Sequence, residues 1–364
     1  MSPSTIRRPQ LKAAVEVVPA SDGRIYLLRG ELAGDLAVED TPFARELLGQ
    51  LAAGDPLEAL AERIPARVDG VVGDDVRASV GQLAELGLVD DAADDDVLTA
   101  AQRARYDRQL RYFAELMPRG ASRAAYQRRL SDARVVVLGV GGLGSWAAYG
   151  LACAGFGSLT VVDGDEVEAS NLNRQILYTP CDIGRPKAEV AAERLREFAP
   201  EAVVRPVVRR VEGSGDVADL VEGADLLVDA ADWPAREIDL WINEACFAAG
   251  VPYTSMGQLP PLIRLGPTYV PGQTGCYACR EAAYRDSHPM YDELVAAKGL
   301  APSPAPTFGP ACGIIGSHAA MEAVHVVTGI CPPSTLGRAV TVDLRSFETT
   351  AERVERDPGC AVCA

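Results

Sequence analysis

The chain has 364 residues, of which 48% are hydrophobic and 24% are charged, the composition of an ordinary globular protein with room for two domains. No apolar run approaches the roughly 18 residues of a membrane-spanning helix, and the N-terminal residues lack the apolar core of a signal peptide. The 35 basic and 51 acidic residues give a net charge of -16, which argues against broad binding to nucleic acid or anionic lipid. We therefore expect a cytoplasmic protein that associates with neither nucleic acid nor membrane.

Residues 1–100 are acidic, lack cysteine and carry the pattern of a small α+β domain. Two β-like runs, Ala14–Val18 and Arg24–Leu28, flank the dipeptide Asp22-Gly23, which is a hairpin signal. Three helical segments follow, at Pro42–Ala53, Leu57–Ile64 and Asp74–Leu86. A hairpin combined with three short helices predicts a winged-helix-like domain.

Winged-helix-like domains often bind DNA, but the charges here argue against that function. Residues 43–100 contain four arginines, no lysine and thirteen acidic residues, whereas a DNA-recognition helix needs basic side chains to neutralise phosphates. Two alternatives stay open. One is a packing or dimerisation module, and the other is a peptide-binding domain that takes up an extended ligand as an additional strand at its sheet edge.

A hydrophilic break at Asp94-Asp95-Asp96 separates this region from a helical stretch rich in arginine and tyrosine at residues 101–117. We interpret residues 101–130 as a helical linker. Residues 131–364 contain every cysteine of the chain and a repeating strand-then-helix pattern. That pattern predicts an α/β domain with a Rossmann-like, mostly parallel sheet flanked by helices.

A nucleotide-binding turn opens this α/β domain. The apolar run Arg134–Leu138 is typical of a strand buried on both faces, and a helix is expected over Ser145–Ala154. The glycines between them allow a tight turn and a close approach of backbone N–H groups to phosphate. These glycines are Gly139, Gly141, Gly142 and Gly144. A second buried strand, Leu159–Val162, leads to Asp163, which follows Gly144 by 19 residues and can bond ribose hydroxyls.

The residues that follow point to a triphosphate rather than to NAD. Asn171, Arg174 and Lys187 supply one polar and two cationic groups. A triphosphate attacked at its α-phosphorus needs several such groups, because they hold the phosphates in line and offset charge on the leaving pyrophosphate. The strand Asp225–Val228 leads to Asp232 at the carboxyl edge of the sheet, where an acid can hold Mg²⁺. We therefore expect ATP and Mg²⁺ as cofactors.

Four of the nine cysteines form two CxxC pairs. Four thiolates in two such pairs fit tetrahedral Zn²⁺, and they leave no ligand position open for catalysis. The members are Cys276, Cys279, Cys360 and Cys363. The sequence therefore predicts one structural zinc that ties the last residues of the chain to the middle of the domain. Two redox-active CxxC motifs are the alternative.

Several of these segments together resemble the ThiF/MoeB family of adenylyltransferases, which are related to ubiquitin-activating enzymes. They are GVGGLG, LTVVDGDEVEASNLNRQ, GRPKAE, the Asp229–Asp232 strand end, the two CxxC pairs and the late segment GIIGSHAAMEAVHVVTG. The resemblance covers residues 103–364 and keeps the order of the motifs. It implies attack of a carboxylate on the α-phosphate of ATP, giving an acyl-adenylate and pyrophosphate.

The resemblance also implies a role for each site residue. Asp163 would hold the ribose and Gly142 would lie under the phosphates. Asn171, Arg174 and Lys187 would contact the triphosphate, while Asp232 would help to bind Mg²⁺. The segment Tyr106–Gln109 is similar to an element whose arginine reaches into the other subunit, which makes Arg108 a candidate catalytic residue across a homodimer.

Two features depart from the family pattern. Many relatives have a cysteine in the loop that crosses over the substrate tail, but residues 280–306 contain none. Cys312 and Cys181 lie near that loop and the predicted triphosphate site, and we expect adenylation without a thioester on the enzyme. Trp233 follows Asp232 where the family commonly has asparagine, a change at the expected substrate entrance.

The N-terminal region resembles the PqqD-like elements that recognise leader peptides in the biosynthesis of ribosomally made, modified peptides. The similar segments are VEVVPASDGRIYLLRG and LAELGLVDD. The resulting hypothesis is adenylation of a carboxyl group on a precursor peptide whose leader is held by residues 1–100. Two alternatives stay open: adenylation of the Gly-Gly end of a ubiquitin-like sulfur carrier, and a scaffold that presents peptides to a partner modifying enzyme.

Overall fold

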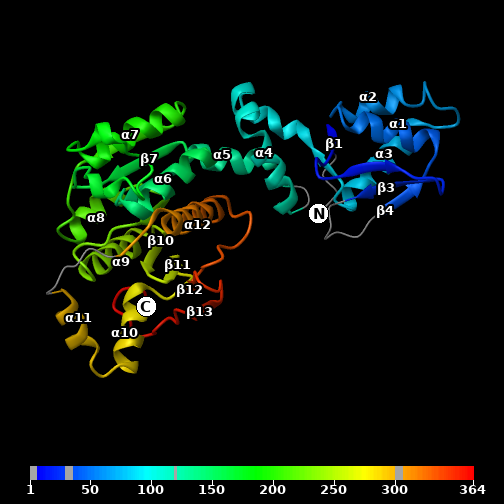
Figure 1. Ribbon diagram of the computed structural model, residues 1–364. Coiled ribbons are helices and arrows are strands. Elements are labelled where there is room, and N and C mark those ends of the chain that lie inside the picture. The colour runs from blue at the N-terminus through cyan, green and yellow to red at the C-terminus, as the bar shows by residue number, and fades with distance from the viewer. Residues whose placement is uncertain (1–5, 29–35, 119–120, 300–305) are drawn as a thin grey trace. The chain divides into compact units, whose positions relative to one another are not determined.

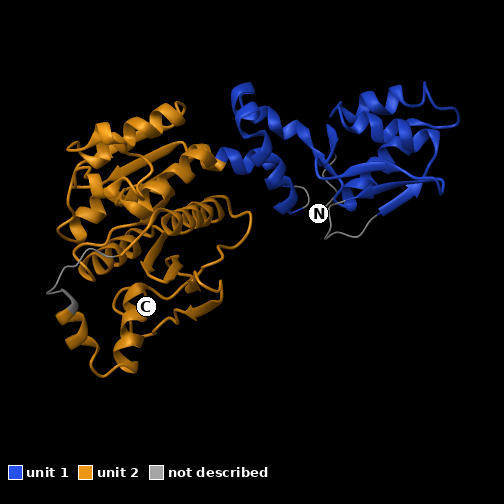
Figure 2. Ribbon diagram, in the orientation of Figure 1, with its two compact units in different colours: residues 1–128 blue, residues 129–364 orange. Residues whose placement is uncertain are grey.

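The computed structural model describes residues 6–28, 36–118, 121–299 and 306–364. The chain divides into two compact units, residues 1–128 and residues 129–364 (Figure 2). Each unit has its own hydrophobic core, and each is described separately.

The first unit combines a small antiparallel sheet with short helices (Figure 1). Its elements are β1 (Pro9–Leu11), β2 (Glu16–Pro19), β3 (Arg24–Leu28), β4 (Leu36–Glu39), α1 (Pro42–Leu51), α2 (Leu57–Arg63), α3 (Gly73–Glu85), β5 (Val89–Asp91), a 3-10 turn (Ala92–Val97), α4 (Ala100–Leu116) and α5 (Arg123–Asp132), the last of which contains the boundary between the units. The expected hairpin is β2–β3, and β4 adds a third strand that the sequence did not reveal. The predicted helices are present with ends that differ by a few residues.

The turn chemistry and the apolar spacing explain this arrangement. Gly23 has φ of 81°, a left-handed conformation that glycine adopts without strain at the hairpin turn. Ile25 and Leu27 alternate along β3 and are almost fully buried against the apolar faces of α1, α2 and α3. The small sheet therefore has one face in the core and one face toward solvent.

The second unit is a doubly covered, mostly parallel sheet, as the sequence predicted. Its strands are β6 (Arg134–Leu138), β7 (Ser158–Val162), β8 (Val203–Val207), β9 (Leu226–Asp229), β10 (Tyr253–Leu259), β11 (Leu262–Tyr269), β12 (Arg338–Asp343) and β13 (Thr349–Arg353). Its helices after α5 are α6 (Gly142–Ala154), α7 (Lys187–Phe198), α8 (Ser214–Val221), α9 (Glu237–Ala249), α10 (Tyr277–Ser287), α11 (Tyr291–Gly299) and α12 (Gly309–Thr328), with 3-10 turns at Ala169–Asn171 and Pro180–Asp182.

The eight strands form one sheet in the order β13-β12-β11-β10-β9-β6-β7-β8. The strands β8, β7, β6, β9 and β10 are parallel, and β11, β12 and β13 continue the sheet antiparallel. The chain leaves β6 toward β7 on one side and later returns to β9 on the other. Such a switch point opens a crevice at the carboxyl ends of the strands, where ligands bind in open α/β sheets.

Helices cover both faces of this sheet (Figure 1). α6 packs against α7 and α12, and α8 packs against α9, as right-handed crossovers from β6 and from β8 require. The core between them consists of Val and Leu side chains from the central strands and Val and Ile side chains from α8 and α9, together with the buried residues Tyr253 and Tyr269. This rigid frame fixes the loops at the switch point.

Candidate functional site

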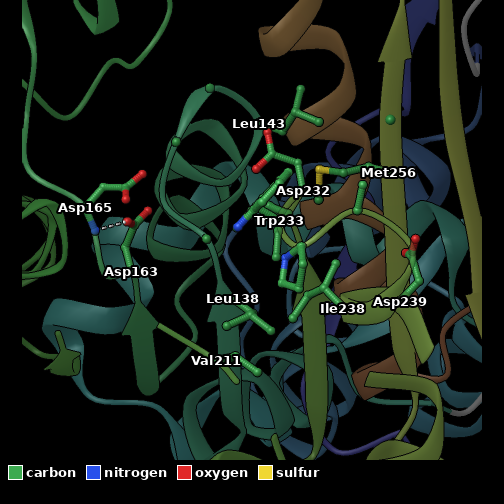
Figure 3. A pocket seen from close by; sticks show the side chains of 18 of the residues that line it. Leu138, Leu143, Asp163, Asp165, Val211, Asp232, Trp233, Ile238, Asp239 and Met256 are labelled. Carbon is green, nitrogen blue, oxygen red and sulfur yellow. Dashed lines mark hydrogen bonds between the residues drawn. The ribbon is translucent and has the colours of Figure 1, made fainter. Parts of the chain in front are cut away.

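A cavity of about 1040 Å³ lies at the carboxyl ends of the parallel strands of the second unit (Figure 3). Most of the residues that the sequence predicted for nucleotide binding line it together. They are Gly139, Gly141, Gly142, Asp163, Asn171, Arg174, Lys187 and Asp232. The fold therefore gathers side chains from β6, β7, β9 and the following loops at the switch point.

The glycine turn follows β6, and two of its glycines leave no room for a side chain. Gly139 has φ of 85°, and a Cβ there would lie 2.7 Å from the Ala230 carbonyl oxygen. A Cβ on Gly144 would lie 1.9 Å from the Gly139 carbonyl oxygen. Gly144 is not among the residues that line the cavity, so its contribution is the close packing of α6 against the turn.

α6 begins at Gly142, three residues before the predicted start. Its first turn therefore includes part of the glycine segment, and Gly142 and Leu143 of that turn line the cavity. A helix N-terminus in this place favours an anionic ligand, since unpaired N–H groups and the helix dipole both attract negative charge.

Asp163 lies directly after β7 and organises the neighbouring backbone. Its two carboxylate oxygens accept hydrogen bonds from Val140 N–H and Asp165 N–H, both at 2.9 Å. Burial raises the pKa of Asp163, and the nearby Lys187 ammonium opposes that shift. A carboxylate held in this way can accept hydrogen bonds from a sugar hydroxyl at the edge of the glycine turn.

The cationic side chains lie on the loops that follow β7. Lys187 is the first residue of α7, its side chain is only 9% exposed, and its Nζ lies 3.1 Å from Asp165 Oδ2. Arg174 Nη1 donates a hydrogen bond to the Ser170 carbonyl oxygen at 2.7 Å. Trp146 Nε1 donates a hydrogen bond to the Arg174 carbonyl oxygen at 3.0 Å. The two cations border the same cavity as the glycine turn.

Asn171 is buried and shapes the loop from within, because its Oδ1 accepts the Glu168 N–H at 3.0 Å. Two further arginines that the sequence analysis missed, Arg209 and Arg210, line the cavity from the segment after β8. Their signal was a pair of basic residues just beyond a strand end.

Acidic side chains line the cavity on more than one side. In Figure 3, Asp163 and Asp165 lie at one side of the view, and Asp232 and Asp239 lie toward the other. Asp229, at the end of β9, is buried, and burial together with the Asp239 carboxylate raises its pKa well above the usual value. Asp232 lines the cavity whereas Asp229 does not, so at this strand end Asp232 offers its carboxylate to a divalent cation.

An apolar part of the wall complements these charges. Leu138, Val211 and Ile238 lie close to Trp233 in Figure 3, and all four line the cavity. Trp233 is 56% exposed. A flat aromatic base can lie against such a wall while phosphates reach the cations.

The two candidate acceptor thiols differ in position. Cys312 lines the cavity, is fully buried, and lies 3.2 Å from Thr307 Oγ1. Burial raises its pKa, although Arg174 and Thr307 oppose the shift, so the neutral thiol is favoured. Cys181 is exposed in the turn before α7.

The four predicted zinc ligands converge at one place. The Sγ atoms of Cys276, Cys279, Cys360 and Cys363 all lie within 4.8 Å of one another. The Sγ–Sγ separations are 3.6 Å for Cys276–Cys360, 3.3 Å for Cys279–Cys363 and 3.8 Å for Cys276–Cys279. A zinc ion with Zn–S bonds of about 2.3 Å separates its sulfurs by about 3.8 Å, so this cluster can hold one.

Outer-shell contacts also suit a metal. The N–H of Asp357 points at Cys279 Sγ from 3.4 Å, as N–H groups do around zinc-bound thiolates. Convergence of both pairs on a single point favours one shared ion over two separate redox pairs. The cluster joins the start of α10 to the last residues of the chain.

Arg108 is the predicted site residue that belongs to the first unit. It lies on α4, where its side chain is 93% exposed and its Nε is 3.9 Å from Asp107 Oδ2. Its action across a homodimer stays a prediction. None of the helices in the described ranges is long and apolar enough to cross a membrane.

Comparison with known proteins agrees with this geometry. The sequence pattern of the ThiF family matches residues 106–362. The molybdopterin-synthase adenylyltransferase of Escherichia coli K12 is 34% identical over 257 residues, which are 70% of this chain and 96% of that protein. The SAMP-activating enzyme E1 of Haloferax volcanii is 36% identical over 277 residues, 73% of this chain and 90% of that protein.

Solved structures match over nearly the whole chain. The Escherichia coli MccB structure with ATP has a TM-score of 0.74 at 24% identity and covers 98% of this chain and 99% of MccB. The structure of PaaA has a TM-score of 0.73 at 25% identity and covers 94% of this chain and 99% of PaaA. The likeness to MccB establishes the fold.

Proposed function

The chain belongs to the ThiF family and is an ATP-using adenylyltransferase, and on that premise we propose that it adenylates a carboxyl group on a ribosomally made precursor peptide. The acceptor carboxylate attacks the α-phosphorus of ATP. The bond between that phosphorus and the bridging oxygen of the pyrophosphate breaks. The products are an acyl-adenylate and pyrophosphate, and the adenylate serves a later modification step.

The residues that line the cavity can perform this reaction by position and charge alone. Lys187 and Arg174 would bind the phosphates, with Asn171 beside them and the first turn of α6 below. Asp163 would bind the ribose. Mg²⁺ held by Asp232 would neutralise part of the triphosphate charge.

The presence of the first unit is the observation that supports a precursor peptide as the acceptor. The ThiF family pattern begins at residue 106, and the curated adenylyltransferases for sulfur carriers match only 65–73% of this chain. The MccB structures, by contrast, match 98% of it, and one of them shows this microcin C7 biosynthetic enzyme in complex with N-formylated MccA. The first unit therefore distinguishes this chain from enzymes that act on sulfur carriers.

We assign leader binding to the β4 edge of the first unit. Among the described residues, β4 pairs only with β3, so its outer edge offers unpaired backbone groups to an added strand. Leu36 and Val38 are half-buried and reach the core, where they can complete pockets for ligand side chains. The opposite edge strand, β2, is exposed throughout and contains Pro19, which has no N–H to donate.

We further propose a homodimer in which the linker, residues 101–130, brings Arg108 to the partner's cavity. The 93% exposure of its side chain supports this role, because the guanidinium is available to a second copy. One structural zinc per chain at the four cysteines completes the assignment, with elemental analysis of the purified protein as its test.

Pyrophosphate exchange tests the function directly. The full-length enzyme with ATP and Mg²⁺ is offered a precursor peptide with its leader, the same peptide without the leader, and a carrier protein ending in Gly-Gly. We expect exchange with the peptide and a KM that rises at least about tenfold when the leader is removed, because tethering raises the local concentration of a weakly bound core. Exchange with the carrier protein alone would favour the alternative function, adenylation of a sulfur carrier.

A scaffold without catalysis is the second alternative, and Arg174→Ala separates it from an enzyme. If the chain is an enzyme, this variant loses exchange and keeps leader affinity. Tight leader binding without exchange by the unsubstituted chain, and with no effect of Arg174→Ala, would favour the scaffold.

A further inference from the structure

We propose that Asp165 is the positioning residue that aims the Lys187 ammonium at the triphosphate, and that Arg210 holds the Asp165 carboxylate in place while it does so. Neither residue entered the set predicted from the sequence. The inference rests on the proposed phosphate-binding role of Lys187, and it is independent of which acceptor the enzyme uses.

Asp165 holds Lys187 at two points. Its backbone carbonyl oxygen accepts the Lys187 N–H at 2.9 Å, and its carboxylate accepts the Lys187 ammonium at 3.1 Å. Its own N–H donates to Asp163 Oδ1 at 2.9 Å. One residue therefore links the carboxylate proposed for the ribose to the ammonium proposed for the phosphates, and fixes the spacing between them.

A lysine needs such a partner more than an arginine does. Its ammonium stands on a flexible four-carbon stem, and ordering that stem costs rotamer entropy each time a ligand binds. The Lys187 side chain is only 9% exposed, whereas that of Asp165 is 50% exposed, so the ion pair points from the protein interior toward the cavity. An ammonium has three N–H donors, and one bond to Asp165 leaves two for phosphate oxygens.

Arg210 supplies a second cation to the same carboxylate. Its Nη2 donates to Asp165 Oδ1 at 2.7 Å, on the oxygen that Lys187 does not use. The Arg210 side chain crosses over Gly164, where a Cβ would lie 2.4 Å from Arg210 Cγ. The glycine in this motif thus makes room for the arginine.

The two contacts explain how the Asp165 carboxylate can keep its position when an anionic ligand binds. As Lys187 shares its charge with phosphate, Arg210 continues to neutralise Asp165 and prevents its rotation toward solvent. Within the described part of the chain, the Asp163 carboxylate also contacts this group through the Asp165 N–H, and its proximity disfavours any change that leaves Asp165 without a cation.

The proposal predicts a split between kcat and KM. In Asp165→Asn, the backbone bonds are kept while the charge that orients Lys187 is lost. We expect kcat for pyrophosphate exchange to fall about tenfold, because a misdirected ammonium stabilises the transition state less. The KM for ATP is expected to change less than kcat, since the released Lys187 stem must be ordered on binding while a repelling carboxylate is gone, and these two effects on ground-state binding oppose each other.

A double-mutant cycle separates positioning from a merely structural role. In a Lys187→Ala background, Asp165→Asn should change the exchange rate by less than about twofold, because the residue through which Asp165 acts is absent. Asp343→Asn, which removes an ion pair with Arg345 outside the cavity, is the matched control and should also stay within about twofold. The same cycle on the Kd for AMPCPP needs no acceptor and gives a second readout.

The outcomes are distinct. An unchanged kcat in Asp165→Asn, or a loss that is equally large without Lys187, would overturn the inference. If Lys187→Ala itself leaves both exchange and AMPCPP affinity intact, the proposed role of Lys187 fails first, and the positioning role fails with it. If Lys187→Ala abolishes exchange while Asp165→Asn has no effect, only the positioning role is wrong.

Discussion

The glycine turn gives a sharp test of how the fold forms the nucleotide site. In Gly144→Ala, the new Cβ would lie 1.9 Å from the Gly139 carbonyl oxygen. That distance is far inside the optimum of about 3.5–4.0 Å for nonbonded contacts, and the atom in the way belongs to backbone. Either α6 or the turn must therefore move.

The expected change in the free energy of unfolding of Gly144→Ala follows from two opposing contributions. Alanine gains about 1 kcal/mol over glycine within a helix, whereas overpacking of this kind costs about 1–3 kcal/mol. Because the clash is with backbone, we take the upper part of that range and expect a net loss of about 1–2 kcal/mol. For a unit of this size, such a loss lowers Tm by about 2–8 °C.

The functional effect arises because the displaced carbonyl belongs to the phosphate-facing turn. We expect the Kd for AMPCPP, measured by calorimetry, to rise about tenfold. Gly215→Ala on α8 is the matched control, because nothing lies within 4 Å of its Cβ position. If Gly144→Ala equals Gly215→Ala in both Tm and Kd, the packing argument is refuted.

Three further changes test the remaining parts of the site. Asp163→Ala should raise the Kd for AMPCPP at least about tenfold, because the proposed ribose acceptor and two loop bonds at 2.9 Å disappear together; an unchanged Kd would contradict this role. Cys279→Ser should lower both the zinc content by elemental analysis and Tm, while Cys153→Ser, an exposed cysteine outside the cluster, should lower neither. Burial alone would raise the pKa of Glu322, but His325 and the bonds from Thr335 and Ser334 hold it far below its usual value. The Glu322 carboxylate therefore stabilises the fold above its unfolded pKa of about 4.3, and this stabilisation is lost as pH falls toward the folded pKa. We expect Glu322→Gln to lower the free energy of unfolding in urea by about 3–5 kcal/mol at pH 7. The loss should be smaller at pH 4.

Local pattern was sufficient for the elements whose residues are buried on both faces. The strands β6 and β7 match the predicted apolar runs almost residue for residue, because a central parallel strand must be apolar throughout. Edge elements were different. β1 was not predicted: it pairs with β5, Pro9 opposite Asp91, and a three-residue strand of mixed polarity has no pattern of its own.

Chemistry-bearing residues were found from the sequence when they stood in spaced motifs. The four cysteines and the glycine turn belong to that class, because metal ligands and phosphate turns impose fixed short spacings. Asp165 and Arg210 were missed, since each is an ordinary charged residue until the strand order β7-β8 brings them to 2.7 Å. Asp239, which also lines the cavity, was missed for the same reason.

The sequence alone thus determined the composition of the protein's core, the α/β fold class, the ThiF resemblance and most of the residues proposed for ATP. These properties depend on the order and spacing of neighbouring residues, which the chain carries directly. Only the tertiary structure decided which of those residues face one cavity and which, like Gly144, serve packing, and it alone brought Cys276 and Cys360 to 3.6 Å across 84 positions. Such contacts depend on how strands cross over and pair, and those long-range choices follow from burying the whole core at once rather than from any local segment.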